Sequence, residues 1–208
     1  ATPEPDFLGG GGRSGPEADA AAHFAGAEVP RAPCFTMVVK IRAKVPPPPR
    51  NEYDTPPPPT NQHFLAWGST DNSRRSVDFR LTPKGNLEYG EHDGSLSNGW
   101  RVVTATPYLK LVDGRWHSVS VVRQDTGFVW LYCDGELVGS GCIAANLPPN
   151  LTTGARSFRW VRKDSVFHGD VGPLRIFRAE LSIGQVRAVE VLSGTPRLSQ
   201  LGPAGVPA

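Results

Sequence analysis

The sequence lacks several features that would place it in a common class at once. None of its apolar runs approaches the ~18 residues that a membrane-spanning helix needs, so no membrane span is predicted. The formal net charge is +2 with both signs interspersed, and this argues against a nucleic-acid partner, which would favour a basic patch or stripe. The chain also starts without the basic and apolar segments of a secretion signal. This predicts a mature protein, a fragment, or a protein that is never secreted.

Cysteine is scarce too. Cys34, Cys133 and Cys142 show neither a C-x-x-C pair nor a cysteine–histidine spacing typical of zinc sites. Two interpretations stay open: three buried thiols, or one disulfide with one thiol left over. A turn at Asp134-Gly135 would set Cys133 opposite Glu136, so Cys133 and Cys142 would not face each other directly. The cysteines therefore do not decide the compartment.

Catalytic patterns are absent from the sequence as well. Jelly-roll glucanases carry Glu-x-Asp-x-x-Glu on one strand, because residues two apart share a face and the two carboxyl groups must flank the sugar. The nearest segment here, Glu91-His92-Asp93-Gly94, has no third acid. There is no G-x-S-x-G elbow either, and His117 is interpreted as a packed side chain satisfied by a backbone carbonyl. We therefore predict no catalytic residue and no enzymatic activity.

Glycine and proline, with 23 and 21 residues, are concentrated near the N-terminus and in one internal segment. Residues 1–17 cannot bury apolar surface, so a Gly/Pro-rich flexible tail is predicted there, and 194–208 is predicted to be a C-terminal tail. Two four-proline runs within 46–62 favour extended polyproline-II. We interpret this segment as a loop insertion, the alternative being a rigid arm that docks onto a proline-binding groove or a neighbouring subunit.

The rest of the chain is typical of short β-strands separated by turns. Phe35, Met37, Val39 and Ile41 are apolar at alternate positions, as expected for a strand with one face in a core. Further strands are expected at 64–68, 77–81, 86–90, 100–103, 116–122, 128–133, 157–161 and 174–178. Spacings of about 8–12 residues with turn residues between them indicate an all-β sandwich.

One short helix is expected near the C-terminus. Ser182 and Gln185 have the spacing of a capping box, in which each satisfies a backbone N–H of the first turn. Ile183, Val186 and Val189 or Val191 would pack the helix on the sandwich, and the helix is expected to end near 193–194.

Two segments carry a resemblance to a known family. Trp116-His117 precedes alternating valines, and Tyr132-Cys133-Asp134-Gly135-Glu136-Leu137-Val138 follows, in which Asp134-Gly135 predicts a type I′ hairpin turn. Residues 169–182 end in an aromatic residue, a basic residue, leucine and serine. Together these segments resemble laminin-G-like domains of the concanavalin-A-like superfamily, over about residues 18–193. The resemblance implies an all-β fold, a two-sheet antiparallel jelly-roll sandwich whose signature is Trp116, His117, Tyr132, Asp134 and Gly135.

A finer resemblance concerns the same hairpin and the strand that ends at Phe177-Arg178. Their order along the chain looks similar to the lectin-like C-terminal domain of trypanosomal trans-sialidases. No Ser-x-Asp-x-Gly-x-Thr repeat is present. The resemblance therefore implies only the non-catalytic part of those proteins.

The candidate binding residues are aromatic and charged side chains. Trp67, Trp100, Trp130 and Trp160 cannot all lie deep in a small sandwich, so we expect two or three in the core and one exposed, where it could stack on a sugar or on a partner. The ligand-binding candidates are Trp67, Trp100, Trp160 and Arg159.

Two further candidate sites are a calcium site and an N-glycosylation site. The resemblance implies a calcium ion held by loop oxygens at the rim of the sandwich, for which Asp71 and Asp93 are the candidates. Asn150-Leu151-Thr152 is an N-glycosylation sequon, which matters only in a secreted protein.

Two functions follow, both of them non-catalytic. The first is recognition of a glycan or glycoprotein outside the cell, which the resemblance and the sequon favour. The second is a structural subunit that docks into a larger protein assembly, which the proline-rich segment and the tails favour. An extracellular or cell-surface location is the expectation, and the sequence names neither ligand nor partner.

Overall fold

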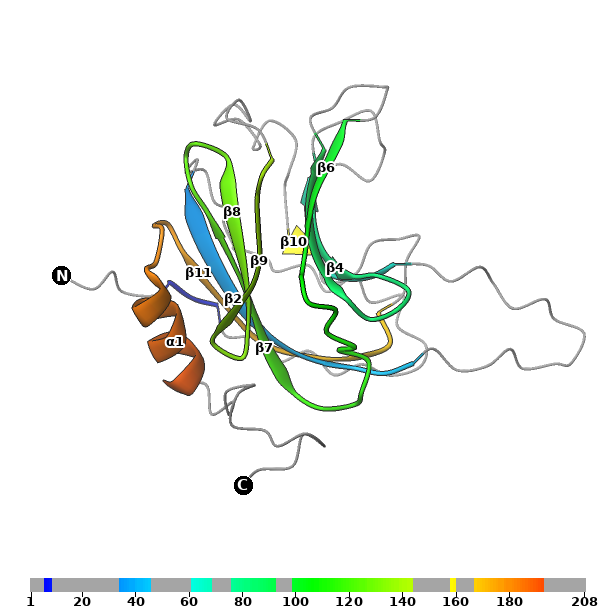
Figure 1. Ribbon diagram of the computed structural model, residues 1–208. Coiled ribbons are helices and arrows are strands. Elements are labelled where there is room, and N and C mark those ends of the chain that lie inside the picture. The colour runs from blue at the N-terminus through cyan, green and yellow to red at the C-terminus, as the bar shows by residue number, and fades with distance from the viewer. Residues whose placement is uncertain are drawn as a thin grey trace, which may run out of the picture.

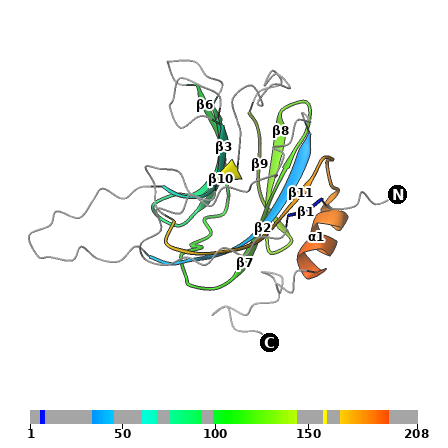
Figure 2. The ribbon, with the colours of Figure 1, turned by 180° about the vertical axis from the view of Figure 1, so that it is seen from behind.

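The computed structural model describes residues 6–8, 34–45, 61–68, 76–92, 99–143, 158–159 and 167–192, and the structural statements below concern these residues. They form two antiparallel sheets packed face to face, with a helix on the outer side of the larger sheet (Figure 1). The view from behind shows the same two layers and the helix on the side away from the smaller sheet (Figure 2). The predicted jelly-roll sandwich with one short helix is confirmed.

The larger sheet contains six strands within the described part of the chain. In spatial order they are β1 (Asp6–Leu8), β11 (Gly169–Phe177), β2 (Phe35–Ala43), β7 (His117–Arg123), β8 (Phe128–Cys133) and β9 (Glu136–Cys142). β2 lies between two strands that come much later in the chain, since Thr36 is opposite Val122 on one side and Phe177 on the other. The centre of this sheet is therefore built from distant segments.

The smaller sheet contains five strands, again counting the described residues. Their order is β10 (Phe158–Arg159), β3 (Gln62–Gly68), β4 (Ser76–Leu81), β5 (Leu87–His92) and β6 (Trp100–Thr104). β3 to β6 follow one another in space as in sequence, as the predicted succession of short strands required. The turn from β4 to β5 contains Gly85, whose φ of 85° suits glycine.

Alternation along the strands fills the space between the sheets. Phe35, Met37, Val39 and Ile41 of β2 are each at most 1% exposed, as the predicted strand required. They meet Phe79 and other apolar residues of the smaller sheet in one continuous core. Burying one such side chain contributes roughly 1.5–3 kcal/mol, so this core is the main source of the sandwich's stability.

The Asp134-Gly135 turn joins β8 to β9 as predicted. Asp134 and Gly135 have φ values of 49° and 79°, the positive values that a type I′ turn requires. The same turn places Cys133 opposite Glu136 and leaves Cys142 opposite Phe128.

All three cysteines are free, so the disulfide interpretation is wrong. The other interpretation, three buried thiols, holds for Cys133 alone. Cys34 is half-buried and Cys142 is exposed.

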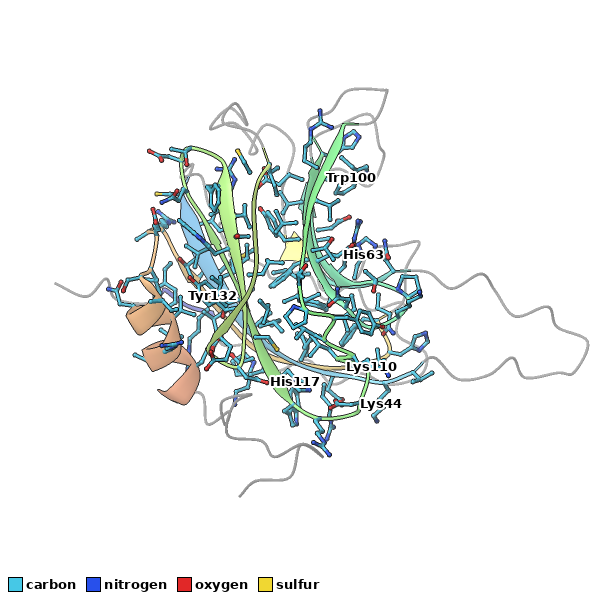
Figure 3. All side chains as sticks on the ribbon, viewed as in Figure 1. Lys44, His63, Trp100, Lys110, His117 and Tyr132 are labelled. Atoms are coloured by element: carbon cyan, nitrogen blue, oxygen red, sulfur yellow. The ribbon has the colours of Figure 1, made fainter. Side chains whose placement is uncertain are left out.

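The helix α1 (Ile183–Leu192) covers part of the outer face of the six-stranded sheet. Val186 is fully buried there and packs with Val38, Val122, Tyr132, Phe177 and Leu181 in a second apolar cluster. β8 is thus covered on both faces, with Leu131 in the main core and Tyr132 beneath the helix (Figure 3). No helix of the described residues has the length and apolar character to cross a membrane.

The capping box at the start of α1 is present. The backbone N–H of Ser182 donates to Gln185 Oε1 at 2.9 Å, and the Gln185 N–H approaches Ser182 Oγ at 3.4 Å. One expected contact was wrong: Ile183 is 42% exposed instead of packing on the sheet. The apolar side of α1 begins one turn later, at Val186 and the partly buried Val189.

An acidic residue lies buried under the last turn of α1. Glu190 is 2% exposed, and its Oε1 accepts a hydrogen bond from Ser120 of β7 at 2.6 Å. Burial raises the pKa of Glu190 to about 7. The helix is therefore docked through a buried carboxyl group that keeps its proton to a higher pH than a solvated one does.

The predicted N-terminal tail contains one element of structure. Asp6–Leu8 is strand β1, which pairs with Leu174–Ile176 of β11 at the edge of the larger sheet. The prediction of a flexible tail over 1–17 therefore does not hold at residues 6–8, which form a paired strand. The remainder of 1–17, the proline-rich segment 46–62 apart from its last residues, and 194–208 lie outside the described residues, so those predictions stand as predictions.

Candidate functional site

The five-stranded sheet is curved, and its concave side faces away from the six-stranded sheet (Figure 1). Side chains alternate along a strand, so the neighbours of core residues point to this concave side. Phe79 and Tyr89 belong to the core. Asp78 and Arg80 flank Phe79, and Glu88 precedes Tyr89. The concave face is therefore lined by charged side chains at its centre.

Arg80 is the centre of a polar network on this face. Its Nε donates to Glu88 Oε2 at 3.1 Å, and its Nη1 lies 3.7 Å from Asp78 Oδ2. Thr104 donates to the other oxygen of Glu88 at 3.0 Å. Asp78 Oδ2 is also 3.3 Å from Nδ1 of His63. The network thus connects side chains of four neighbouring strands, β3 to β6.

Trp100 lies next to this network at the start of β6 (Figure 3). Its ring is 5.4 Å from the guanidinium carbon of Arg80 and 5.2 Å, centroid to centroid, from the ring of His92. Gly90 leaves the space that the indole occupies, because a Cβ at this position would lie 3.2 Å from two Trp100 ring atoms. The half-buried indole therefore lies across the sheet surface with a cation beside it.

Exposure is graded across the concave face. His63, Asp78 and His92 are buried, at 5%, 1% and 3%. The side chains of Arg80 and Glu88 keep 13% and 15% exposure, and Thr104 is exposed. The part of the network that a ligand can reach therefore lies over β5 and β6, next to Trp100.

The sequence-predicted binding residues have different outcomes. Trp100 lies on the concave face beside Arg80 and His92, and its role in ligand binding stays a prediction. Trp67 and Arg159 are in β3 and β10, where Trp67 is opposite Phe158 and Arg159 is opposite Ala66, and the structure describes their backbone only. Trp160, the calcium candidates Asp71 and Asp93, and the sequon residue Asn150 lie outside the described residues and stay predictions.

Sequence reasoning missed the ionic part of this site. Asp78, Arg80, Glu88 and His92 alternate with core residues along β4 and β5 and were not among the predicted binding residues. The available signal was the pair of charged positions two residues apart, Asp78-x-Arg80. Its meaning depends on strand register, which sets Arg80 opposite Glu88 and Asp78 opposite Gly90.

Comparison with protein families agrees with this architecture. A laminin G model described as the concanavalin A-like lectin/glucanases superfamily matches residues 54–187. The chain belongs to this superfamily. The resemblance read from the hairpin and from the last strand is thereby confirmed, while the finer likeness to trans-sialidases stays a prediction. Comparison with curated protein sequences finds no match.

Solved structures of this concanavalin A-like fold include several similar ones. The CBM40 of Ruminococcus gnavus IT-sialidase bound to α2,6-sialyllactose has a TM-score of 0.57 and 17% identity, covering 77% of this chain and 85% of that one. The SAP-like pentraxin of Limulus polyphemus gives 0.51 and 15%, covering 80% and 74%. The binding domain of botulinum neurotoxin serotype G gives 0.50 and 14%, covering 79% and 37%. At these identities the likeness establishes the fold.

Two of the predicted signature residues, His117 and Asp134, form a polar cluster with Asp113 at one end of the six-stranded sheet, where Figure 3 labels His117. His117 Nδ1 donates to Asp134 Oδ2 at 2.8 Å, and Nε2 lies 3.2 Å from Asp113 Oδ1. Burial alone would lower the pKa of His117, but the hydrogen bond and charge of Asp134, together with Asp113, outweigh burial and raise it. The expected backbone-carbonyl partner was wrong, because two carboxylates hold this imidazole.

This cluster also satisfies the distance condition for a metal site. Donor atoms of His117, Cys133 and Asp134 lie within 4.8 Å of one another. Both Asp134 oxygens, however, already accept hydrogen bonds, Oδ1 from the Ser118 N–H at 2.8 Å and Oδ2 from His117. Burial and the charge of Asp134 raise the pKa of the Cys133 thiol well above its usual value, so the thiol stays protonated and is a poor ligand. The donor set fits a hydrogen-bonded turn better than an ion, and its nitrogen and sulfur do not suit calcium.

Trp116 was expected to be part of the fold signature, but it lies largely at the surface. Its side chain is 41% exposed on the outer side of the six-stranded sheet. The guanidinium of Arg42 lies 5.1 Å from its ring centre, and Asp170 fixes that guanidinium through contacts of 2.8 and 2.6 Å. Gly172 lies beneath the ring edge, where a Cβ would be 3.4 Å from it. The structure therefore presents this tryptophan on the opposite side of the sandwich from Trp100.

Proposed function

We propose that the chain is a non-catalytic module that binds glycans on the concave face of its five-stranded sheet. The observation that carries this is Trp100 lying beside the Arg80–Glu88–Thr104 network. A sugar ring has an apolar C–H face and a rim of hydroxyls. Its recognition needs an aromatic surface and, around it, fixed donors and acceptors. The concave face offers both within neighbouring strands.

The similar solved structures support this proposal. They include the IT-sialidase CBM40 bound to sialyllactose with either linkage and the binding domain of botulinum neurotoxin DC in complex with SialylT. These proteins show that the sandwich is compatible with sugar recognition. The ligand of this chain must be read from its own residues.

The carboxylates of the concave face support a binding role over a catalytic one. A glycosidase needs two carboxyl groups that flank the sugar, one as acid and one as base or nucleophile. Asp78 and Glu88 both contact Arg80 instead, at 3.7 and 3.1 Å. Both carboxylates are thus engaged with the guanidinium between them instead of facing a bound sugar from two sides.

A glycan array probed with the full chain tests the proposal. We expect binding to a defined set of oligosaccharides, lost or reduced at least tenfold by Trp100→Ala. Trp116→Ala, a tryptophan on the other side of the sandwich, is the matched control and should bind as the wild type does. A folded wild-type chain that binds no glycan on the array would refute the proposal.

A second candidate is docking to a protein subunit, and the exposure of Trp116 favours it. A large aromatic side chain with an arginine fixed over it is typical of residues that dominate protein interfaces. Quantitative capture from extracts of the source organism, with wild type, Trp116→Ala and Trp100→Ala as baits, tests it. A partner retained by Trp100→Ala and lost with Trp116→Ala would support docking, whereas equal capture by all three baits would contradict it.

A further inference from the structure

The charge of Arg80 is already balanced before any ligand arrives. Its Nε donates to Glu88 at 3.1 Å, Asp78 lies 3.7 Å from Nη1, and the guanidinium carbon is 5.4 Å from the Trp100 ring. We propose that Glu88, by occupying Arg80, makes this face select neutral glycans over sialylated ones. This inference rests on the proposed glycan-binding function and adds the class of sugar and the residue that determines it.

A carboxylate-bearing sugar would need a cation that is free to pair with it. Arginine recognises carboxylates through two parallel N–H···O bonds, and Glu88 already takes the Nε side of that fork. Thr104 holds the second oxygen of Glu88 at 3.0 Å, so Glu88 is fixed from both ends and does not swing away without losing two hydrogen bonds. Binding a sialic acid here means displacing Glu88 from Arg80.

The alternative is to place a third carboxylate beside the first two, and this is unfavourable. Asp78 and Glu88 both lie next to Arg80, whose side chain is only 13% exposed. Like charges in a partly buried site repel more strongly than in open water, because solvent screens them less. Such an arrangement of acids discriminates against anionic ligands by repulsion.

A neutral sugar meets none of these costs. Arginine has five N–H donors, and those that Glu88 does not use can donate to hydroxyl oxygens without a need for charge. Glu88 and Thr104 can also accept or donate toward sugar hydroxyls from the accessible side of the network. Trp100 supplies the apolar surface beside them, so the three kinds of contact that a neutral ring requires are within reach of one another.

The test uses the full chain and matched neutral and anionic probes. An array of lactose, N-acetyllactosamine, gluco-oligosaccharides and arabino-oligosaccharides is compared with α2,3- and α2,6-sialylated lactose and N-acetyllactosamine, followed by calorimetry on the strongest binders. We expect the wild type to prefer a neutral probe by at least tenfold. Glu88→Gln removes the competing charge and should shift the ratio toward sialylated probes by about tenfold.

Glu136→Gln is the matched control, since Glu136 pairs with Arg187 at 3.5 Å on the other sheet and should leave the ratio unchanged. If Glu88→Gln does not fold, Glu88→Thr is the alternative variant, because it also removes the charge and threonine is favoured in strands. A wild type that prefers sialylated probes, or a ratio that neither Glu88 variant moves, would overturn the inference while the glycan-binding function stands. A folded wild type that binds no probe at all would overturn both.

Discussion

Arg123 of β7 and Glu91 of β5 form an ion pair across the interior of the sandwich, with 2.7 Å between Nε and Oε1. Both residues are 1% exposed. Tyr89 donates a further hydrogen bond to Glu91 Oε1 at 2.6 Å. Burial raises the pKa of Glu91 against the opposing effect of Arg123. The two sheets are thus joined by charge as well as by apolar packing. The ion pair lies on the core-facing side of β5, the strand whose other face carries Glu88 and Gly90.

The first prediction concerns this pair. Arg123→Met should destabilise the fold by about 3–5 kcal/mol, because it leaves Glu91 buried without its cation. Adding Glu91→Gln should recover part of the loss, since glutamine still accepts from Tyr89 and carries no charge. Urea unfolding of the wild type, the two single variants and the double variant measures this. A loss in unfolding free energy for the double variant equal to the sum of the two single losses would contradict the prediction.

The second prediction concerns pH. Burial raises the pKa of Glu190 from 4.5 to about 7, so the folded chain holds this proton more tightly than the unfolded chain. The resulting stability is complete below about pH 4.5 and is lost as pH rises through 7. The loss amounts to about 3 kcal/mol by pH 8.

Unfolding free energies of wild type and Glu190→Gln between pH 4.5 and 8 isolate the contribution of Glu190. The glutamine variant should lack this part of the slope. Val186→Ala, which weakens helix packing without changing a charge, should lower stability by a similar amount at every pH. A Glu190→Gln profile parallel to that of the wild type would count against the assignment.

The third prediction concerns the two carboxylates around His117. Asp134 is 1% exposed and 2.8 Å from the imidazole, whereas Asp113 is 37% exposed and 3.2 Å away. Asp134→Asn should therefore lower the pKa of His117 more than Asp113→Asn does. Asparagine tolerates the positive φ at this position, so the turn is expected to persist. NMR titration of the imidazole protons decides between them, and an equal or larger effect of Asp113→Asn would be contrary to expectation.

The fourth prediction compares two glycines. A Cβ on Gly169 would overlap the carbonyl oxygen of Arg42, so Gly169→Ala must displace β2 or β11 and should cost at least ~2 kcal/mol. A Cβ on Gly184, in α1, meets nothing within 4 Å, and Gly184→Ala should add up to ~1 kcal/mol through helix propensity. The midpoint of thermal unfolding should fall for Gly169→Ala and rise for Gly184→Ala.

Local chemistry explains what the sequence could predict. The type I′ turn requires only Asp134-Gly135, the capping box only Ser182 and Gln185, and the apolar face of β2 only its own alternation. These features are determined by neighbours in the chain. They were confirmed because the tertiary structure uses each of them without opposing it.

The remaining features depend on partners far away in the chain. β1 has three residues and no periodic pattern, and it exists because β11 offers it an edge. The Arg80–Glu88 pair depends on the register between β4 and β5, and the carboxylate partners of His117 depend on where two turns meet. The exposure of Trp116 was missed because its position beside His117 marked it as part of the fold rather than of the surface.

The position of β2 at the centre of the larger sheet has a consequence for how the protein is made. β2 leaves the ribosome long before β7 and β11, the strands that flank it. Until they are synthesised, the apolar face of Phe35, Met37, Val39 and Ile41 has no sheet to join, and both of its edges can pair with other chains. Closure of such distant pairings is slow. A chain interrupted before β11 would carry β2 with one open edge and is expected to aggregate. Pairing with β11 therefore prevents β2 from pairing with other chains.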